Sequence, residues 1–379
     1  MYKVGKLNKI SPVGLNILTD EYKVIENLEE AEAILVRSAD MHEMQFSDNL
    51  LAIARAGVGV NNIPLDRCAD EGIVVMNTPG ANANGVKELV IGGMLLAYRN
   101  LVDASNWAAA LEEGEVSIEK QVEKGKSSFR GNEIAGKKLG IIGLGGIGVM
   151  IANAAMDLGM EVTGFDPYFS TKSALNLNSD ITIAKKMMDV VPDADFLIAQ
   201  VHSTPATKGM ISREVISAMK EGSVLLNFAR APIVDEEAVK DALAAGKLRK
   251  YVTDFPNAEI KDTRNIIMLP HLGASTDEAE DNCAKMAVKE IMEYIENGNA
   301  INAANIPSVS LGKKNGTRVA VISKASDTIV ADVTAAVGSI KKIESKSNDK
   351  YTYTLVETDK DIDTLEIANN AVIKVRVIK

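Results

Sequence analysis

A glycine-rich hexapeptide is the strongest chemical motif in the sequence. Gly143-Leu144-Gly145-Gly146-Ile147-Gly148 matches the pattern G-x-G-x-x-G, closes the apolar run KLGII and precedes the helical stretch VMIANAAMDLG. In such a motif the first glycine permits a tight turn, the second lets a pyrophosphate approach the backbone, and the third allows close packing of helix against strand. The helix N-terminus then favours the phosphates. The motif predicts a dinucleotide site at 143–148, with a structural glycine turn as the alternative.

An acidic residue follows this motif where a ribose ligand is expected. Asp166 ends the next apolar run, EVTGFD, 18 residues after Gly148. A carboxylate at this position accepts hydrogen bonds from the ribose hydroxyls of the cofactor and repels a 2′-phosphate. NAD is therefore the predicted cofactor, in preference to NADP.

The sequence has 3 histidines, and one of them has the setting of an acid–base catalyst. His42 lies in the polar stretch ADMHEMQFSD, and His202 ends an apolar run in a loop that we assign to the cofactor side. His271 lies in LPHLGAS, directly after the apolar run NIIML. Because histidine titrates near neutral pH, we predict that His271 gives or takes the substrate proton, with a structural histidine as the alternative.

Two charged residues would complete this chemistry. A histidine that protonates an alkoxide after hydride transfer needs a carboxylate partner that keeps the imidazolium populated. Glu259, in the segment DFPNAEIKD, is the first candidate, ahead of Asp254 and Asp262. A substrate carboxylate requires a bidentate guanidinium, and Arg230 follows the run SVLLNF after one residue, Ala229. Each residue alone resembles a surface charge, but their shared position after apolar runs favours one site.

Short β-branched runs alternate with helical patterns from about residue 31 to residue 270. The candidate strands are AILVR, LAIARA, IVVMN, KLGIIG, EVTGFD, DFLIAQVH, SVLLNF, KYVTDF and NIIML. Apolar strands separated by helices are typical of a parallel sheet covered on both faces. Because these strands exceed one compact sheet, we predict two α/β units, connected by helices near 84–112 and 275–297.

The C-terminal residues predict a third, smaller unit. Residues 305–316, NIPSVSLGKKNG, lack periodicity and are predicted to be a linker. Beyond them, candidate strands and helices alternate in the ferredoxin-like order β-α-β-β-α-β, with the second helix near 361–369. The predicted fold class is α/β, with two Rossmann-like domains and a ferredoxin-like α+β domain. The predicted bounds are 1–90 with 274–304 for the discontinuous substrate domain, 91–273 for the NAD-binding domain and 317–379 for the C-terminal domain.

Composition excludes several classes of partner. Lys and Arg total 42 and Asp and Glu total 52, so the net charge is −10. This acidic excess disfavours nucleic acid and anionic membranes, which attract positive proteins. Cys68 and Cys283 are too few for a disulfide framework, and no window contains the ~20 apolar residues of a membrane span. We expect a cytoplasmic protein with a small-molecule substrate.

Several segments resemble the D-isomer-specific 2-hydroxyacid dehydrogenases. They are ARAGVGVNNI, NTPGANANGVKELV, GLGGIG, FDPY, NFARAPIVDE and PHLGAST, and the likeness covers roughly residues 30–304. It implies that Arg230 binds substrate, that His271 is the acid–base, and that Glu259 is its partner, although the family's D-V-F-x-x-E-P stretch here reads TDFPNAE. The other implied ligands are Arg37, Ser38, Val58, Gly59 and Asn82 for substrate, and His202, Ala229 and Asp254 for cofactor. We also expect a homo-oligomer, a dimer or tetramer. Because exposure of its large ring would be unfavourable, Trp107 is expected at a dimer interface or within its domain.

The C-terminal unit is similar to the ACT domain of members that oxidise 3-phospho-D-glycerate to 3-phosphohydroxypyruvate, the first step of L-serine biosynthesis. Two departures qualify this resemblance. The run Arg37-Ser38-Ala39-Asp40 lacks the Thr and Lys that serve the substrate phosphate in relatives, so we hypothesise that Lys87 replaces the missing cation. The turn 324–328 lacks the proline and glycine of an effector site, which predicts weak or absent serine inhibition.

Three alternatives stay open. Another 2-hydroxyacid dehydrogenase, acting on hydroxypyruvate, glyoxylate or D-lactate, would use the same residues. Erythronate-4-phosphate dehydrogenase also has an extra C-terminal domain. A non-catalytic NAD sensor or corepressor of this fold would keep the glycines without turning over substrate.

Overall fold

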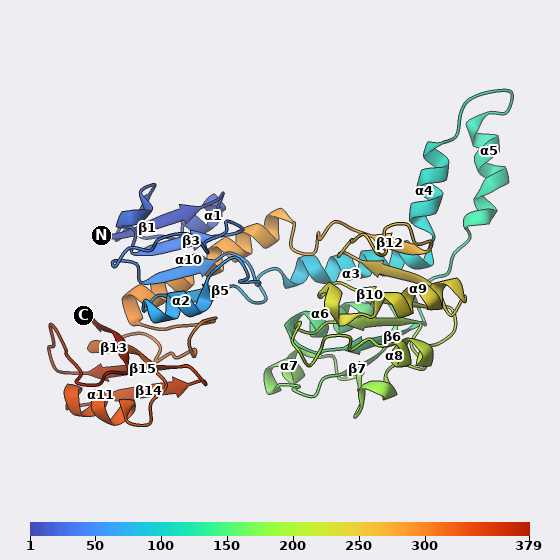
Figure 1. The fold of residues 1–379 in the computed structure, drawn as a ribbon. Helices are drawn as coiled ribbons and strands as arrows, with labels where there is room; N and C mark the ends of the chain where they lie inside the picture. Colours follow the sequence, from blue (N-terminus) through green and yellow to red (C-terminus); the bar gives the residue numbers. More distant parts are fainter. The chain divides into compact units, whose positions relative to one another are not determined.

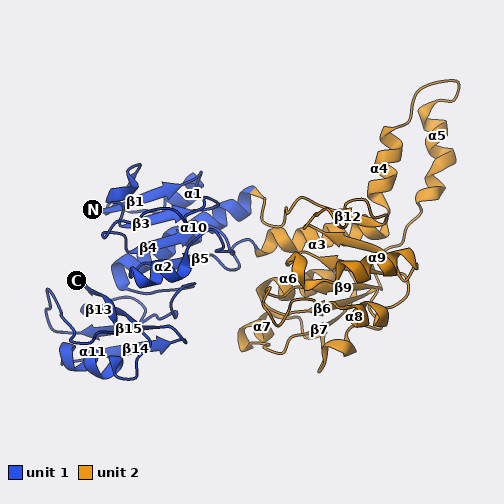
Figure 2. Cartoon of the chain, viewed as in Figure 1, with its two compact units in different colours: residues 1–82, 277–379 blue, residues 83–276 orange.

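A computed structural model describes all 379 residues as two compact units. Unit 1 contains residues 1–82 and 277–379, and unit 2 contains residues 83–276 (Figure 2). No helix is both long and apolar enough to cross a lipid bilayer. The predicted fold class is confirmed, because both units contain a parallel sheet and a small antiparallel sheet follows (Figure 1).

Unit 1 begins with a five-stranded parallel sheet in the order β2-β1-β3-β4-β5. The strands are β1 (Tyr2–Leu7), β2 (Tyr22–Ile25), β3 (Ala33–Val36), β4 (Ala52–Arg55) and β5 (Val74–Asn77). Short helices α1 (Pro12–Leu15) and α2 (Leu65–Asp70) and the long helix α10 (Asp277–Asn297) accompany it. Helix α10 was predicted by apolar residues at 3–4 spacing, and that face is buried against the sheet.

The C-terminal sheet belongs to the same unit and has the predicted ferredoxin-like order, β14-β15-β13-β16. Its elements are β13 (Thr317–Lys324), α11 (Ile329–Val337), β14 (Lys342–Ser347), β15 (Tyr351–Thr358) and β16 (Val372–Ile378). Helix α11 covers one face, where Val319, Val321 and Val333 pack. The other face, with Tyr353 and Leu355, shares one apolar core with α10 and the five-stranded sheet.

Two C-terminal predictions need correction. Residues 305–316 are not a free linker, because Ile306 and Val309 are buried and Val309 pairs with Ala300 through two backbone hydrogen bonds. The helix expected at 361–369 does not form. This segment runs irregularly and places Ile362, Leu365 and Ile367 against the core under α11, a spacing that does not follow one helical face.

Unit 2 contains a seven-stranded parallel sheet in the order β12-β11-β10-β9-β6-β7-β8, the doubly wound arrangement. The strands are β6 (Lys138–Ile142), β7 (Glu161–Phe165), β8 (Thr182–Ile183), β9 (Phe196–Ala199), β10 (Ser223–Asn227), β11 (Leu248–Thr253) and β12 (Ile266–Met268). Helices α3 (Ala83–Tyr98), α6 (Gly146–Asp157), α7 (Thr171–Asn176), α8 (Arg213–Ala218) and α9 (Glu236–Ala244) accompany them. Helix α3 packs on α6 and β10, so the compact unit 2 includes residues 83–90 in addition to the predicted NAD-binding domain, 91–273.

A helical hairpin projects from unit 2 (Figure 1). It consists of α4 (Leu101–Ala109) and α5 (Ile118–Gly125), followed by a 3-10 turn at Lys126–Phe129. Trp107 packs inside the hairpin, with its ring 5.1 Å from that of Phe129 and close against Gly125. The indole therefore contacts residues of its own domain.

Candidate active site

The glycine motif forms a tight turn between β6 and α6. Gly143 has φ +101°, and a Cβ there would lie 2.4 Å from the carbonyl oxygen of Gln200. A Cβ on Gly148 would lie 2.0 Å from the carbonyl oxygen of Gly143. These two positions therefore require glycine, one for backbone conformation and one for close packing of the helix on the strand.

The middle of the motif is open. A Cβ on Gly145 or Gly146 would meet nothing within 4 Å, and no side chain caps the N-terminus of α6. Ile147 turns the other way and packs against the apolar core. The exposed N–H groups at the start of this 12-residue helix form an anion-binding end.

Asp166 lies beside this turn, at the end of β7. Its Oδ2 accepts a hydrogen bond from the backbone N–H of Leu144 at 2.9 Å, and its Oδ1 accepts one from that of Tyr168 at 2.8 Å. The carboxylate thus links the glycine loop to the next loop. Tyr168 is 90% exposed, an unusual position for a large aromatic ring.

Other predicted cofactor residues follow β9 and β10. His202 is exposed, and its carbonyl oxygen accepts a hydrogen bond from Oγ1 of Thr207 at 2.6 Å, which closes the loop. Ala229 is buried, and its N–H donates to Oδ1 of buried Asn227 at 3.2 Å. Nδ2 of Asn227 donates to the carbonyl oxygen of Arg230 at 3.0 Å. Asn227 therefore fixes the backbone that presents Arg230.

Arg230 and His271 both lie at the carboxyl edge of the seven-stranded sheet. The Arg230 side chain is exposed, and its Nη1 donates to the carbonyl oxygen of Ala229 at 2.7 Å. His271 has φ +49°, and its backbone N–H donates to the carbonyl oxygen of Asp254 at 3.0 Å. Its ring lies 4.9 Å from that of Phe255. A non-glycine residue in the left-handed region is a feature that often occurs at functional sites.

Asp254 connects these two residues. Its side chain is 1% exposed, Oδ2 lies near Gly273, and Oδ1 has no hydrogen-bond partner. Burial raises the pKa of Asp254, while the charges of His271 and Arg230 act in the opposite direction. Asp254 is therefore a buried carboxyl whose pKa is lowered by the charges of both residues.

Glu259 lies in the loop after β11 and is exposed. Its backbone N–H donates to Oδ1 of Asn257 at 2.9 Å, but its carboxylate makes no hydrogen bond to His271. The structure thus places Glu259 and His271 on loops at the same edge without joining their side chains.

The predicted substrate loops of unit 1 follow β3, β4 and β5. Arg37 forms an ion pair with Glu280 of α10 at 2.6 Å, and the N–H of Ser38 donates to Oδ1 of Asn8 at 3.0 Å. The carbonyl oxygen of Val58, next to half-buried Gly59, accepts from Nδ2 of Asn77 at 2.6 Å.

Asn82 and Lys87 follow β5. Oδ1 of Asn82 is buried without a partner. Lys87 belongs to unit 2 and donates to Oδ1 of Asn84 at 2.6 Å.

Comparison with known proteins identifies the family. Residues 91–273 match the model described as the D-isomer specific 2-hydroxyacid dehydrogenase, NAD binding domain. A relative from Schizosaccharomyces pombe is 33% identical over 333 residues, which cover 80% of this chain and 68% of that protein. The chain belongs to the D-isomer specific 2-hydroxyacid dehydrogenase family. The predicted resemblance is confirmed.

Other relatives within the family are named D-3-phosphoglycerate dehydrogenase. The Methanocaldococcus jannaschii protein is 34% identical over 308 residues, which cover 78% of this chain and 56% of that protein. The Mycobacterium tuberculosis (H37Rv) protein is 31% identical over 326 residues, 80% and 58% of the two chains. The chain thus spans little more than half the length of these relatives. The NAD⁺-bound 3-phosphoglycerate dehydrogenase structure of Entamoeba histolytica has a TM-score of 0.62 at 25% identity and covers 80% of this chain and 98% of its own.

The residues of unit 2 fit the cofactor of this family, and the predicted cofactor, NAD, is confirmed at family level. The open glycine turn accommodates a pyrophosphate. The orphaned oxygens, Oδ1 of Asp254 and Oε1 of Gln200, need a hydrogen-bond donor, such as the carboxamide of a nicotinamide.

Sequence reasoning missed two residues that support the predicted substrate loops. Nε of Arg55 donates to the carbonyl oxygen of Arg37 at 3.0 Å, and its guanidinium lies directly over Gly57. Asn77 holds the Val58 carbonyl. Both lie within the family-like segments, ARAGVGVNNI and NTPGANANGVKELV, so their position in those motifs was the available signal.

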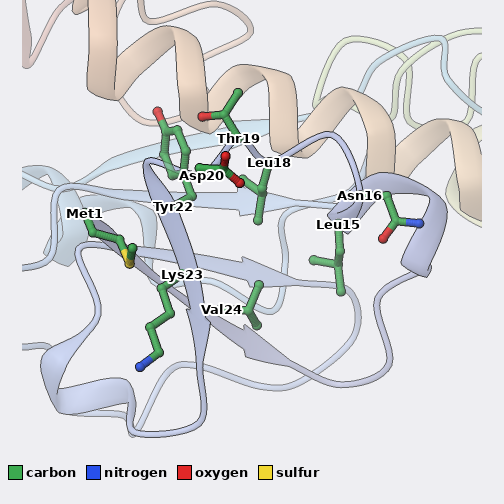
Figure 3. A pocket seen from close by; sticks show the side chains of 9 residues that line it. All are labelled: Met1, Leu15, Asn16, Leu18, Thr19, Asp20, Tyr22, Lys23 and Val24. Carbon is green, nitrogen blue, oxygen red and sulfur yellow. The ribbon is translucent and has the colours of Figure 1, made fainter.

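One cavity of about 790 Å³ lies elsewhere, at edge strand β2 (Figure 3). Leu15, Leu18, Tyr22 and Val24 contribute to its lining, and the Tyr22 hydroxyl donates to Oε1 of Glu296 at 2.7 Å. None of the predicted site residues lines it, and its polar groups do not converge on a ligand position. We therefore assign no chemistry to this cavity.

Proposed function

We propose that this chain oxidises 3-phospho-D-glycerate to 3-phosphohydroxypyruvate with NAD, the first step of L-serine biosynthesis. The names of its relatives at 31–34% identity support this reaction. The observation that carries the proposal is the placement of Arg230, His271 and Asp254 at one sheet edge beside the dinucleotide turn. A cytoplasmic location is part of the same proposal.

Each of the chain's own residues has a separate role in the proposed reaction. Arg230 binds the substrate carboxylate, and the amides near Val58 and Gly59 orient it. His271 removes the C2 hydroxyl proton during oxidation and returns it during reduction. Glu259 stabilises the protonated imidazole. The nicotinamide, when bound, accepts hydride from C2, so the alcohol loses one hydride and one proton.

The substrate phosphate needs cations, for which we propose Lys87 and Arg37. Lys87 is held only by the neutral Asn84 amide and a 3.7 Å contact with Glu88, so its charge is available. Arg37 would have to exchange Glu280 for the phosphate. Lys87→Met is expected to raise KM for the phosphorylated acid about tenfold, the loss of one charge-assisted bond. An unchanged KM would contradict this role.

The deciding experiment measures NADH oxidation with 3-phosphohydroxypyruvate, hydroxypyruvate, glyoxylate, pyruvate and 2-oxoglutarate. A kcat/KM at least about 100-fold higher for the phosphorylated acid supports the proposal. Binding of NADH without turnover of any acid would instead indicate the sensor or corepressor alternative.

A second candidate is a dehydrogenase of another 2-hydroxy acid, such as a hydroxypyruvate or glyoxylate reductase or erythronate-4-phosphate dehydrogenase. The absence of a lysine after Arg37-Ser38 favours a substrate without phosphate at that position, and the Arg37–Glu280 pair agrees. Equal or better turnover of hydroxypyruvate or glyoxylate in the same experiment would select this candidate.

We further propose that the ACT-like C-terminal sheet has a structural role and responds weakly or not at all to serine. The turn 324–328 is held on both sides: Lys324 pairs with Asp70 of α2, and the N–H of Ala325 donates to the carbonyl oxygen of Lys350 at 2.9 Å. Inhibition of NADH oxidation by micromolar serine would overturn this proposal.

The projecting hairpin supports a homo-oligomer, a dimer or tetramer. Leu101, Val116 and Ile118 are exposed along it at 42%, 50% and 36%. Exposed apolar side chains on a projecting element favour burial against another subunit. Val116→Asp should reduce the mass measured by light scattering, and an unchanged mass would place the interface elsewhere.

A further inference from the structure

A half-buried carboxyl lies next to the predicted catalytic loop. Glu236, the first residue of α9, follows Arg230 by one short turn. Its Oε2 accepts a hydrogen bond from Nδ2 of Asn257 at 2.8 Å, and its Oε1 is buried without a partner. A half-buried carboxyl at the sheet edge that bonds a loop amide needs a structural or functional reason.

Asn257 continues this connection into the loop of Glu259. Its Oδ1 accepts hydrogen bonds from the backbone N–H of Glu259 at 2.9 Å and from that of Ile260 at 3.3 Å. The Ile260 side chain is fully buried, so this end of the loop is anchored. The amide of Asn257 therefore uses one side to hold the Glu259 backbone and the other to bind α9.

Asn257 connects the Glu236 carboxylate to the backbone of Glu259. Burial is the main cause that raises the pKa of Glu236, and the charge of Glu259 raises it further. The hydrogen bond from Asn257 acts against both. Lys240 is the cation that also faces Glu236, but its Nζ is engaged by Glu237 at 2.5 Å.

We propose that Glu236 and Asn257 form a positioning pair that holds Glu259 at the sheet edge where it serves His271. The inference rests on the proposed function, since it assigns a role within that acid–base chemistry. Glu259 has no side-chain bond to His271, so its position depends on its loop. Without Asn257 the loop would lose the two hydrogen bonds that set the direction of residue 259.

The test compares Asn257→Ala, Glu236→Ala and Glu236→Gln. The neighbouring variant Glu237→Ala is the control, because it removes an exposed carboxylate from the same turn of α9. Steady-state NADH oxidation is measured from pH 5 to 10 with the best keto acid. Thermal unfolding and amide hydrogen exchange of residues 257–261 are measured on the same samples.

Asn257→Ala and Glu236→Ala should lower kcat about 10- to 100-fold, with KM for NADH unchanged. The pH at which reduction falls to half should move lower, because a misplaced Glu259 no longer favours the protonated histidine. Glu236→Gln retains an acceptor for Asn257 and should restore most of the rate. Glu237→Ala should match the wild type.

Several results would overturn the pair. One is a lower Tm with an unchanged pH profile, which a merely structural bond would give. Another is a Glu236→Gln enzyme as impaired as Glu236→Ala. If the wild type turned over no keto acid, the proposed function would fail, and amide hydrogen exchange would then be the test of the positioning pair. Equal exchange rates of the Glu259 and Ile260 amides in the wild type and in Glu236→Ala would refute the pair.

Discussion

Two buried charged side chains, one in each unit, differ in their hydrogen-bond partners. Arg318 in the C-terminal sheet of unit 1 is fully buried, and its donors are engaged. Its Nε and Nη2 donate to Oε2 of Glu357 at 3.0 and 2.9 Å, and Nη1 donates to the carbonyl oxygens of Asn297 and Gly312 at 2.7 and 2.9 Å. Asp254 of unit 2 is equally buried but leaves one oxygen orphaned.

The difference separates a structural joint from a proposed binding site. Arg318 connects the end of α10, the segment 311–312 and β15, so its satisfied guanidinium fastens the C-terminal sheet to the rest of unit 1. Asp254 lies at the carboxyl edge of a parallel sheet, where α/β proteins bind ligands, and its missing donor fits a cofactor. Because Oε1 of Glu357 is also buried without a hydrogen-bond partner, the position of Asp254 at the ligand-binding edge of a parallel sheet, and not burial or one orphaned oxygen, distinguishes the two roles.

The largest loss of stability is expected where Arg318 fastens the C-terminal sheet to the rest of unit 1. Arg318→Met leaves the Glu357 carboxylate buried without its partner and should lower the free energy of unfolding by about 3–5 kcal/mol. The double variant Arg318→Met/Glu357→Leu should recover most of this loss in urea unfolding. Arg213→Met is the control, because it breaks an exposed 2.7 Å pair with Asp241 and should cost less than about 1 kcal/mol. A similar small loss at Arg318 would remove the contrast between the regions.

An intermediate effect on stability is expected at Glu290 of α10, which is buried and has a hydrogen-bond partner for only one of its two carboxylate oxygens. Asn302 donates to its Oε1 at 2.7 Å, and burial raises the pKa of Glu290 to about 8. The folded protein therefore retains a proton that the unfolded chain loses above about pH 4.5, so stability should fall as pH rises through this range.

Glu290→Gln keeps the shape and removes the titration. Between pH 5 and 8 the wild type should lose about 2–4 kcal/mol of unfolding free energy relative to this variant. Parallel curves for the two proteins would show that Glu290 is already ionised in the fold.

The smallest change in stability is expected at the site itself. Asp254→Asn relieves a buried carboxylate, so the unfolding free energy should stay equal or rise. NADH affinity should weaken about tenfold, because a neutral amide oxygen is a weaker acceptor than a carboxylate oxygen. Fluorescence titration and thermal unfolding measure both quantities. A loss of stability as large as that of Arg318→Met would place Asp254 among the structural residues.

Much of the parallel architecture could be predicted from the sequence. Each of the nine predicted strands overlaps an observed one, because runs such as SVLLNF are buried on both faces and therefore continuously apolar. Strand β1 was missed because Lys3 and Lys6 interrupt its apolar residues, and β2 because only Tyr22 of its four residues is buried. The glycine motif was recognisable because the local backbone geometry requires glycine at positions 143 and 148.

Contacts between segments that are distant in the sequence could be known only from the tertiary structure. Residues 305–316 resemble a linker in composition, yet Asn305 completes the edge of β5 by accepting from the N–H of Val75 at 2.9 Å and donating to the carbonyl oxygen of Ile73 at 2.8 Å. The roles of Asp254 and Glu236 depend on which distant groups surround them. The sequence by itself determined the strands, the dinucleotide turn and the residue types at the sheet edge, because these follow from local periodicity and sterics. Only the folded chain decided which buried charges are satisfied, because each partner comes from another segment.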